Sequence, residues 1–365
     1  SSIKKSEVII IAVGTPQSNS GRADMSYVDS VVNSIKENLN GYKVICTKST
    51  VPIGSGKSIV DNLKSSFKED FDFNYVSNPE FLREGSAVKD FLWPDRIIIG
   101  TSSLKAYEIM CDVYRPLYIN KNPISHTSVE TAEMIKYASN SFLALKISYI
   151  NEIANLCELV GADVHDVASA MGRDGRISEK FLHPGPGFGG SCFPKDLESL
   201  SAISIEKGFE MHTLNAVIKA NKNQKIQMCN KLEALLDGDL KNKEIAVLGL
   251  AFKANTDDVR ESSSIDMINF ILSKGGVVRA YDPIANHSMS KLFSNISYFQ
   301  NVYAAIKKAD AVVLMTEWNE FRSLDLIRIR KEMNGKFILD TRNIINMKEL
   351  SSLGFVYDNV GRIKL

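Results

Sequence analysis

The chain has 365 residues, of which 44% are hydrophobic and 24% are charged. This is an ordinary composition for a globular protein, and the length suggests two or three domains. The formal net charge of +1 gives no bulk electrostatic attraction to nucleic acid or to an anionic membrane. The longest apolar runs, such as residues 8–13, are far too short to span a membrane.

The first third of the chain alternates apolar, β-rich runs with helical patterns. Four runs predict short buried strands, at residues 7–16, 42–52, 73–81 and 95–100. Residues 26–41, between the first two runs, have helical spacing and end in glycine, as an amphipathic helix would. Continuous apolar strands separated by helices predict a parallel sheet covered on both faces.

A helical region is predicted next. Thr127 with Glu130 three residues later fits a capping box that opens a helix. The helical pattern of residues 128–161 is long for a globular helix, which suggests a connector or a dimer core. More helix is predicted at residues 213–236.

The α/β pattern returns after Lys243. A helix closed by glycines is predicted at residues 263–276. Strands are predicted at residues 243–253, 277–283, 309–318 and 335–343. The chain therefore reads as α/β, then all-helical, then α/β.

Five cysteines are scattered along the chain and never form a C-x-x-C pair. This arrangement argues against a disulfide framework or a metal site and fits a reducing, cytoplasmic compartment. Cys46, Cys111, Cys157 and Cys229 have apolar or helical neighbours, so we expect them to be small core residues. Cys192 alone lies in a glycine-rich loop.

Two glycine patterns imitate nucleotide-binding loops. Gly185, Gly187 and Gly190 in "HPGPGFGGSCFPKD" match G-x-G-x-x-G, but the preceding residues are polar and end at Pro184. Because a dinucleotide fingerprint needs a strand immediately before it, we interpret this match as false. The run "GSGKS" at residues 54–58 lacks the first glycine of a P-loop and predicts only a loop that enters a helix.

The glycine-rich loop is better explained by Cys192. Pro194 and the helical pattern of residues 195–203 place this thiol at a helix N-terminus beside Lys195. A positive field there lowers a thiol pKa, so we interpret Cys192 as a nucleophile. The alternative is a buried structural cysteine in a tight turn.

Two further pairs are spaced by four residues. Lys136 and Asn140 share a face of the long helix, where an ammonium and an amide could point at one oxygen. Glu80 and Glu84 follow a proline. Spacing alone favours a solvated face for Lys136 and Asn140, and for Glu80 and Glu84 it makes an exposed face as likely as a functional pair.

Taken together, these features resemble one family over essentially the whole chain, the nucleotide-sugar dehydrogenases. The motifs that carry the resemblance are "AVGTP", "KSTVPIG", "NPEFLREG", "PDRIIIG", "AEMIKYASNSFLALKISYINEI", "GFGGSCFPKD" and "GLAFKANTDDVRESSS". Sister enzymes that act on 2-acetamido sugars typically carry a "GGHC" loop, so residues 176–196 look like the UDP-glucose branch.

The resemblance implies a fold of two Rossmann-like doubly wound parallel-sheet domains joined by a central all-helical domain with one long helix. The implied domains are an NAD-binding domain at 1–125, a helical domain with the cysteine loop at 126–238 and a UDP-sugar-binding domain at 239–365. It also implies a homodimer built on the long helix.

The implied reaction is a two-step, NAD-dependent oxidation of UDP-glucose to UDP-glucuronate, which supplies polysaccharide synthesis. Cys192 would form a thiohemiacetal and then a thioester, and Lys136 with Asn140 would stabilise the oxyanion. Asp196 with Thr50 would hold a water or act as base, and Glu80 would serve thioester hydrolysis.

Binding residues are carried over in the same way. The implied cofactor contacts are Thr15, Pro16, Ser49, Thr50, Glu84, Cys192 and Arg260. The implied substrate contacts are Phe81, Leu82, Arg83, Glu84, Lys136, Asn140, Arg176, Phe188, Gly189, Phe252, Lys253 and Arg342. Arg176 would reach the substrate of the neighbouring subunit.

One part of the family pattern is missing. The family begins with a strand, a true glycine fingerprint and an acidic residue for the adenosine ribose, and the start of this chain supplies none of them. We therefore expect that the first βαβ half of the cofactor domain is absent and that the chain as written binds NAD⁺ weakly or not at all.

Three other functions stay open at this point. One is a dehydrogenase of another nucleotide sugar, either a UDP-N-acetylhexosamine or GDP-mannose. Another is a simple 3-hydroxyacid dehydrogenase, which needs no cysteine, and the last is an inactive nucleotide-sugar-binding fragment.

Overall fold

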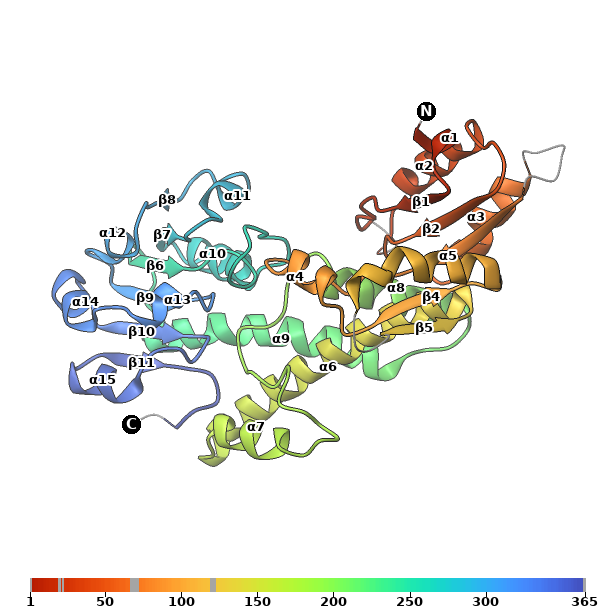
Figure 1. Ribbon diagram of the computed structural model, residues 1–365. Helices are drawn as coiled ribbons and strands as arrows, with labels where there is room; N and C mark the ends of the chain where they lie inside the picture. Colours follow the sequence, from red (N-terminus) through yellow and green to blue (C-terminus); the bar gives the residue numbers. More distant parts are fainter. Residues whose placement is uncertain (1, 19–20, 22, 66–71, 119–122, 364–365) are drawn as a thin grey trace. The chain divides into compact units, whose positions relative to one another are not determined.

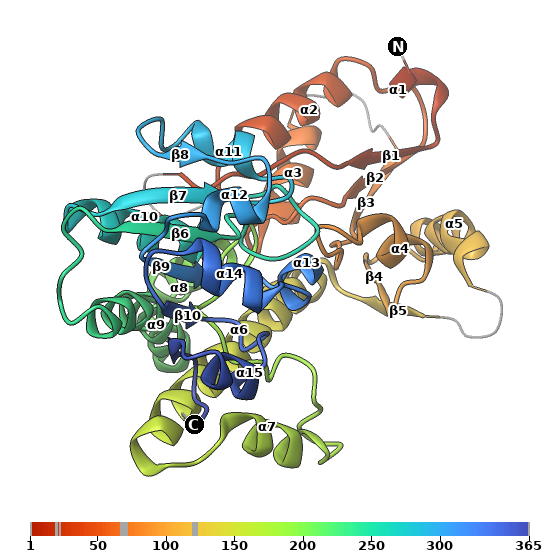
Figure 2. The ribbon, with the colours of Figure 1, turned by 90° about the vertical axis from the view of Figure 1, so that its left-hand side faces the viewer.

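The computed structural model describes residues 2–18, 21, 23–65, 72–118 and 123–363, and the chain divides into two compact units (Figures 1 and 2). The first unit comprises residues 1–141 and 195–211, and the second comprises residues 142–194 and 212–365. Each unit is built around one sheet. The division into three domains at residues 125 and 238 stays a prediction.

The first unit contains a five-stranded sheet in the order β1-β2-β3-β4-β5. Its strands are β1 (Val8–Ile11), β2 (Lys43–Thr47), β3 (Phe73–Ser77), β4 (Ile97–Gly100) and β5 (Ile124–Thr127). Its helices are α1 (Ser2–Lys5), α2 (Ser26–Lys36), α3 (Ser55–Lys64), α4 (Ala87–Leu92), α5 (Leu104–Tyr114), the 3₁₀ turn η1 (Arg115–Leu117) and α8 (Phe193–Glu206), most of which belongs here.

Successive side chains of β2 lie alternately in two separate hydrophobic cores. Ile45 packs with residues of α2 and α3, whereas Val44 and Cys46 pack with residues of α5. Because successive side chains of a strand point to opposite faces, the sheet is covered on both sides. The four strands predicted in this region are confirmed.

The pairing of β3 with β4 corrects the prediction of an all-parallel sheet, because this pair is antiparallel. A parallel neighbour needs a crossover, usually a helix that packs on the sheet. The only helix between these strands, α4, has no buried residue. The segment therefore forms a loop, and β4 returns beside β3. The short polar strand β5 was also not predicted.

Four helices lie between the two sheets in sequence, as predicted. They are α6 (Val129–Val160), α7 (Val164–Gly172), α8 and α9 (His212–Leu235). The capping box at Thr127 is wrong, because Thr127 belongs to β5 and the hydroxyl of Ser128 accepts the N–H of Thr131 at 3.2 Å. An N-cap hydroxyl bonds the amide three residues on, so the cap is Ser128.

The second unit contains a six-stranded parallel sheet in the order β11-β10-β9-β6-β7-β8. Its strands are β6 (Glu244–Leu248), β7 (Val277–Tyr281), β8 (Ser297–Tyr298), β9 (Ala311–Leu314), β10 (Phe337–Asp340) and β11 (Val356–Asp358). Its further helices are α10 (Ser263–Ser273), α11 (Asn286–Ser290), α12 (Val302–Ile306), α13 (Asn319–Arg322), α14 (Leu326–Glu332) and α15 (Met347–Ser352). Read from β8, this is the doubly wound 3-2-1-4-5-6 order, which reverses between β6 and β9.

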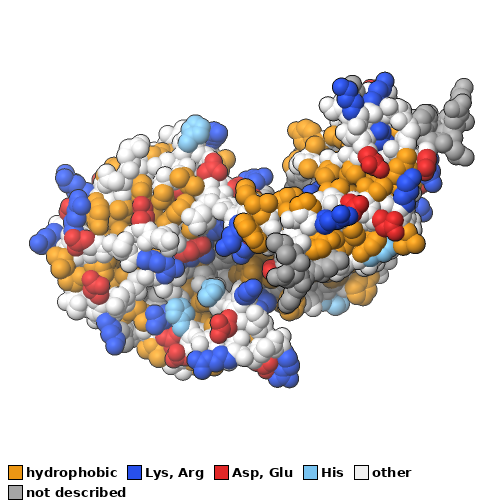
Figure 3. Space-filling model, viewed as in Figure 1, with side chains coloured by type: hydrophobic (Ala, Val, Ile, Leu, Met, Phe, Trp, Pro, Cys, Tyr) orange, Lys and Arg blue, Asp and Glu red, His pale blue; other side chains and the backbone are white. Residues whose placement is uncertain are grey.

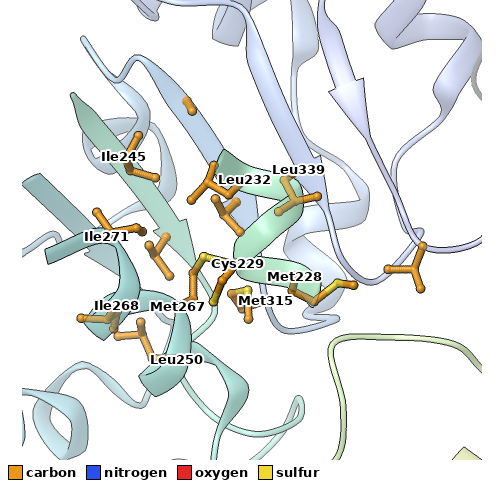
Figure 4. Packing of buried hydrophobic residues seen from close by; sticks show 14 of the residues in the cluster. Met228, Cys229, Leu232, Ile245, Leu250, Met267, Ile268, Ile271, Met315 and Leu339 are labelled. Atoms are coloured by element: carbon orange, nitrogen blue, oxygen red, sulfur yellow. The ribbon is translucent and has the colours of Figure 1, made fainter. Parts of the chain in front are cut away.

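Both faces of this second sheet are buried. On one face, Met228 and Leu232 of α9 pack against Met267 and Ile271 of α10 and against Ile245 of β6 (Figure 4). On the other face, residues of α12, α14 and α15 form a separate core with the alternate strand residues. The predicted fold class is therefore confirmed, apart from the antiparallel pair in the first unit.

The run "GSGKS" enters α3, as predicted, and its backbone binds a carboxylate of the chain itself. Glu133 of α6 accepts the N–H of Gly54 at 2.6 Å and the N–H of Gly56 at 2.8 Å. Orphan amides at a helix start attract an anion. The helices α3 and α6 are thereby joined by a charge-assisted contact.

We predict that Gly56→Ala destabilises the first unit by about 1–3 kcal/mol, because overpacking a closed site forces neighbours to move. An added Cβ would lie 2.4 Å from Val129 Cγ1 and 2.6 Å from Tyr75 Cε1. Gly14→Ala is the control, since its Cβ would meet nothing within 4 Å. Denaturant unfolding of both variants measures the difference, and an equal effect of the two would contradict the packing argument.

Candidate active site

In the first unit, Lys136 of α6 is buried and bound to the loop that follows β3. Its Nζ donates to the carbonyl oxygen of Glu80 at 2.7 Å and to Glu80 Oε1 at 2.8 Å. The Lys136 side chain is 4% exposed. The solvated face that spacing alone favoured is therefore wrong for this lysine, and the predicted partners Lys136 and Glu80 lie together.

Asn140, one turn further along α6, binds Asp196 of α8. Asn140 Nδ2 donates to Asp196 Oδ2 at 2.6 Å. Asp196 Oδ1 is buried without a hydrogen-bond partner among the described residues, and Lys195 Nζ lies 3.6 Å from it. Burial raises the pKa of Asp196, while the cations Lys195 and Lys136 and the Asn140 amide oppose that rise. A buried carboxyl with a raised pKa is suited to accept a proton.

The loops after β1 and β2 are held together by hydroxyl groups. Thr15 Oγ1 donates to the carbonyl of Thr50 at 2.8 Å, and Ser49 Oγ donates to the carbonyl of Val13 at 2.6 Å. Lys195 Nζ donates to the carbonyl of Thr15 at 3.1 Å. Lys195 thus links the β1 loop to the buried carboxylate of Asp196, a role for which its position beside Cys192 in sequence gave no signal.

The loop between β3 and β4 carries the predicted residues Phe81, Leu82, Arg83 and Glu84. Arg83 makes a forked pair with Asp90, with Nε 3.0 Å from Oδ2 and Nη2 2.6 Å from Oδ1. This pair holds the pKa of Asp90 well below its usual range. The ring of Phe81 lies between two cations, 4.0 Å from Arg96 and 5.5 Å from Lys136.

In the second unit, the glycine-rich loop before Cys192 is fixed by buried amides. Asn221 of α9 accepts the N–H of Phe188 at 2.8 Å and donates to its carbonyl at 3.0 Å. Asn151 of α6 accepts the N–H of Gly185 at 2.8 Å. The element directly before this loop is the helix α7, with no strand in the described residues 173–184, so the interpretation of G-x-G-x-x-G as a false match is confirmed.

Cys192 is a half-buried cysteine outside any disulfide and directly before α8, and Ser191 Oγ lies 3.5 Å from its Sγ. Cys46, Cys157 and Cys229 are buried, which confirms three of the four predicted core cysteines. Cys111 is only half-buried. Burial raises the pKa of Cys46 and of Cys229 to about 12, so these two thiols stay protonated near neutral pH.

The carboxyl ends of β6, β9 and β10 bring three predicted substrate contacts together. Arg342 Nη2 donates to the carbonyl of Phe252 at 3.1 Å, and Arg342 Nε donates to the carbonyl of Met315 at 2.8 Å. Lys253 Nζ lies 5.4 Å from the ring of Phe252. In doubly wound sheets, ligands bind where the strand order reverses, which here is between β6 and β9. Cationic and aromatic groups at that point suit a nucleotide diphosphate.

Two predicted arginines contact aspartates close to them in sequence. Arg176 forks onto Asp174 with Nη2 2.6 Å from Oδ2, and its side chain is 89% exposed. Arg260 forks onto Asp258 with Nη2 2.8 Å from Oδ2. The structure therefore leaves the predicted roles of Arg176 and Arg260 untested.

Three family domains match the chain in succession. The NAD binding domain of the UDP-glucose/GDP-mannose dehydrogenase family matches residues 1–118, its central domain matches residues 130–223 and its UDP binding domain matches residues 246–347. The chain belongs to this family.

Individual relatives agree with the family match. The chain is 44% identical over 363 residues to UDP-glucose 6-dehydrogenase TuaD of Bacillus subtilis (strain 168), covering 99% of this chain and 78% of the relative. It is 46% identical to a UDP-glucose 6-dehydrogenase of Rhizobium meliloti (strain 1021), covering 99% and 83%. The solved structure of a UDP-glucose dehydrogenase from Pyrobaculum islandicum matches with a TM-score of 0.90 at 34% identity, covering 98% and 81%.

The family match bears on the expected loss of the first βαβ half. The family's NAD binding domain matches from residue 1, so this match does not support that expectation. No G-x-G-x-x-G occurs in residues 1–118. The loops with Thr15, Pro16, Ser49 and Thr50 lie at carboxyl ends of parallel strands, which is where open α/β sheets bind cofactors. The roles of these four residues as cofactor contacts stay a prediction.

Sequence reasoning missed several polar residues that hold the site. Lys48 Nζ lies 3.3 Å from Asn78 Oδ1 and 3.2 Å from the hydroxyl of Tyr114. Asn221 and Lys225, spaced by four on α9, are also buried or nearly so. Their only signal was polar residues at helical spacing in "NKNQK", which is also typical of an exposed face. Among the described residues, no group of His, Cys, Asp and Glu forms a metal site, and no helix is long and apolar enough to cross a membrane.

The pKa shifts of Asp196 and Asp90 predict opposite pH effects on stability. The pKa of Asp196 is raised in the folded state, so its charge costs stability as pH rises above the unfolded pKa. The pKa of Asp90 is lowered, so its charge adds stability that is lost as pH falls. We expect Asp196→Asn to gain stability relative to wild type as pH rises from about 4 to 7. Asp90→Asn should lose stability relative to wild type as pH rises from about 2 to 5, because a lowered pKa places the contribution of Asp90 around and below its unfolded pKa of about 3.9. Denaturant unfolding at several pH values checks both slopes, and slopes of the same sign would contradict the assignment.

Proposed function

We propose that this chain oxidises the C6 hydroxymethyl group of UDP-glucose to the carboxylate of UDP-glucuronate. Two NAD⁺ and one water are consumed for each sugar. The proposal rests first on the UDP-glucose dehydrogenases that the chain resembles over nearly its full length. The observation that carries it is the set of buried polar pairs in the first unit, Lys136 with Glu80 and Asn140 with Asp196.

In the first oxidation, the chain's residues handle a proton and a developing negative charge. NAD⁺, when bound, accepts one hydride from C6 in each oxidation. Asp196, with its raised pKa, takes the hydroxyl proton through a water that Thr50 helps to hold. Lys136 and Asn140 stabilise the oxygen as it gains negative charge. The product of this step is the aldehyde.

In the second oxidation, Cys192 makes the aldehyde able to lose a hydride. Its thiolate adds to the carbonyl carbon, so a C–S bond forms and the carbonyl oxygen becomes an oxyanion held by Lys136 and Asn140. Loss of hydride from that carbon restores the carbonyl and leaves a thioester. A water activated by Glu80 then attacks the thioester and the C–S bond breaks, which releases the carboxylate and regenerates the thiolate.

Substrate binding falls mainly to the second unit in this proposal. Phe252, Lys253 and Arg342 at the sheet reversal hold the UDP, and Phe188 with Gly189 lines the sugar. Phe81 to Glu84 of the first unit contribute further sugar contacts. The cofactor contacts are those carried over from the family, including Thr15, Pro16, Ser49, Thr50, Glu84 and Arg260, and the enzyme is cytoplasmic.

A homodimer is part of the proposal. Phe142, Tyr149 and Leu156 of α6 are 61%, 48% and 53% exposed. They recur every seventh residue, which gives one apolar stripe along a helix. Exposed stripes of this kind mark interfaces between chains. A partner seated on this stripe would bring Arg176, which is exposed, to the neighbouring substrate.

The reaction predicts two NADH for each UDP-glucose consumed, measured by absorbance against UDP-glucuronate formed. In Cys192→Ser the second oxidation should be abolished or sharply slowed, because a hydroxyl is a far weaker nucleophile than a thiolate. Cys111→Ser, a change at the other half-buried thiol, is the matched control and should keep the stoichiometry. One NADH for each sugar in the wild type would favour a simple alcohol dehydrogenase, and sugar binding without turnover would favour an inactive binding protein.

The dimer predicts that Leu156→Glu shifts the protein to monomer in light scattering, because a charge in an apolar interface is left unpaired. Leu292→Glu is the control, since Leu292 is 56% exposed and lies outside the stripe. The proposed dimer would be contradicted if the wild type were a monomer in light scattering, or if both variants dissociated to the same extent.

A further inference from the structure

The turn just before Cys192 packs against the backbone of residues 260–261 more closely than a side chain would permit. Gly190 N–H donates to the carbonyl of Arg260 at 2.8 Å. A Cβ on Gly189 would lie 2.1 Å from the carbonyl oxygen of Glu261. Real Cβ atoms do not approach oxygen so closely, so position 189 needs glycine. Position 190 needs it as well, because its φ is +84° and a Cβ there would lie 2.8 Å from Phe252 Cε2. The peptide of Arg260 and Glu261 is therefore one wall of the cysteine loop.

That wall is held in an unfavourable backbone conformation. Glu261 has a φ of +52° although it is not glycine, and such a conformation persists only where neighbouring contacts enforce it. Lys225 of α9 supplies such a contact, because its Nζ donates to the Glu261 carbonyl at 3.1 Å. The same Nζ lies 3.2 Å from Asp266 Oδ2 and 3.8 Å from Glu261 Oε2, and the Lys225 side chain is 10% exposed.

Helix α9 thus holds the cysteine loop from two directions. Asn221 bonds both backbone groups of Phe188, and Lys225, one turn further, fixes the carbonyl that Gly189 packs against. A Cβ on Gly187 would lie 2.9 Å from Asn221 Oδ1 and 3.3 Å from Lys225 Cγ. The loop therefore lies against both side chains, with the 260–261 peptide as its other support.

We propose that Lys225 is a positioning residue for Cys192, which it sets by fixing the Glu261 carbonyl against the Gly189–Gly190 turn. This inference rests on the proposed function, in which Cys192 is the nucleophile. Lys225 needs no contact with substrate or with the thiol. A nucleophile displaced by about 1 Å loses up to about 100-fold in rate, so the effect should fall on turnover and on the reactivity of the thiol.

The test compares Lys225→Met, which removes the ammonium, with Lys225→Arg, which keeps a cationic donor. Lys274→Met is the matched control, because Lys274 also pairs with a carboxylate, Glu233, at 2.7 Å, away from the loop. Glu261→Gln removes only the carboxylate and leaves the carbonyl in place. For each variant we would measure kcat and KM for UDP-glucose, and the rate at which iodoacetamide labels each cysteine, by mass spectrometry.

We expect Lys225→Met to lower kcat by roughly 10–100-fold with little change in KM, and to change the labelling rate of Cys192 by at least about threefold. Lys225→Arg should restore most of both, and Lys274→Met and Glu261→Gln should match wild type. Labelling of Cys111 should stay constant, and Cys46 and Cys229 should stay protected, which reports that the variant is folded.

Two results would overturn the inference. One is a folded Lys225→Met variant with wild-type labelling of Cys192 and wild-type kcat. The other is an equal loss in Glu261→Gln, which would assign the effect to the side-chain ion pair rather than to the carbonyl. If Cys192→Ser kept full turnover, the proposed function would fail, and the labelling rates, which need no catalysis, would still decide the role of Lys225.

Discussion

One face of α6 fixes the geometry on which the first unit depends. Glu133, Lys136 and Asn140 follow one another at helical spacing, and each binds a different segment: the start of α3, the loop after β3 and the first turn of α8. All three are buried. Because a buried charge or amide without a partner is costly, each contact ties its segment to the helix. The position of the Asp196 carboxylate is therefore set by a helix that begins more than sixty residues before it.

The second unit positions its loop mainly through backbone groups and neutral amides, with one charged group, the ammonium of Lys225, on the Glu261 carbonyl. Its cysteine loop has no regular secondary structure. Asn151 and Asn221 accept backbone N–H groups of the loop, and Gln224 donates to the carbonyl of Gly185. Bulkier residues at Gly189 and Gly190 would meet the Glu261 carbonyl and the Phe252 ring. The cysteine loop of the second unit is thus held by buried neutral amides, by close backbone contact and by the Lys225 ammonium behind the Glu261 carbonyl.

Figure 3 shows charged side chains dispersed over the visible surface of the protein, which agrees with a net charge near zero.

Many of the strands and helices of this fold can be predicted from local patterns of apolar residues in the sequence. The apolar runs at residues 42–52 and 243–253 predict β2 and β6 because a strand buried on both faces is apolar at successive positions. Sequence could not predict the antiparallel β4, because strand direction depends on whether α4 packs on the sheet, and that is a tertiary property. It also misplaced the cap of α6 by one residue, since Thr127 and Ser128 are both good caps and pairing of β5 with β4 decides between them.

The site residues also fall into two groups, those with a local signal in the sequence and those without one. The glycines before Cys192 and Pro194 in the first turn of α8 predict a special loop, because glycine permits backbone conformations that other residues avoid and proline fixes φ. Lys136 and Asn140 had no such signal, and only the resemblance to a family selected them. Lys225 and Lys48 were missed, because a lysine without a local partner in the sequence is usually solvated. Lys195 was predicted only as a cation beside Cys192, and its contacts with Thr15 and Asp196 were not predicted. Their burial here comes from segments that are distant in the chain.

The internal carboxylate in the "GSGKS" loop has a consequence for ligand choice. A dehydrogenase of this family meets two phosphate-bearing ligands, the cofactor and the nucleotide sugar, and any exposed cluster of amide donors would compete for both. The two amides of Gly54 and Gly56 are already occupied by Glu133. A phosphate could displace this carboxylate only by separating α3 from α6 and leaving a charge buried without a partner. The chain thus fills this anion site with a carboxylate of its own, which leaves the carboxyl ends of the parallel strands as the place for diphosphates.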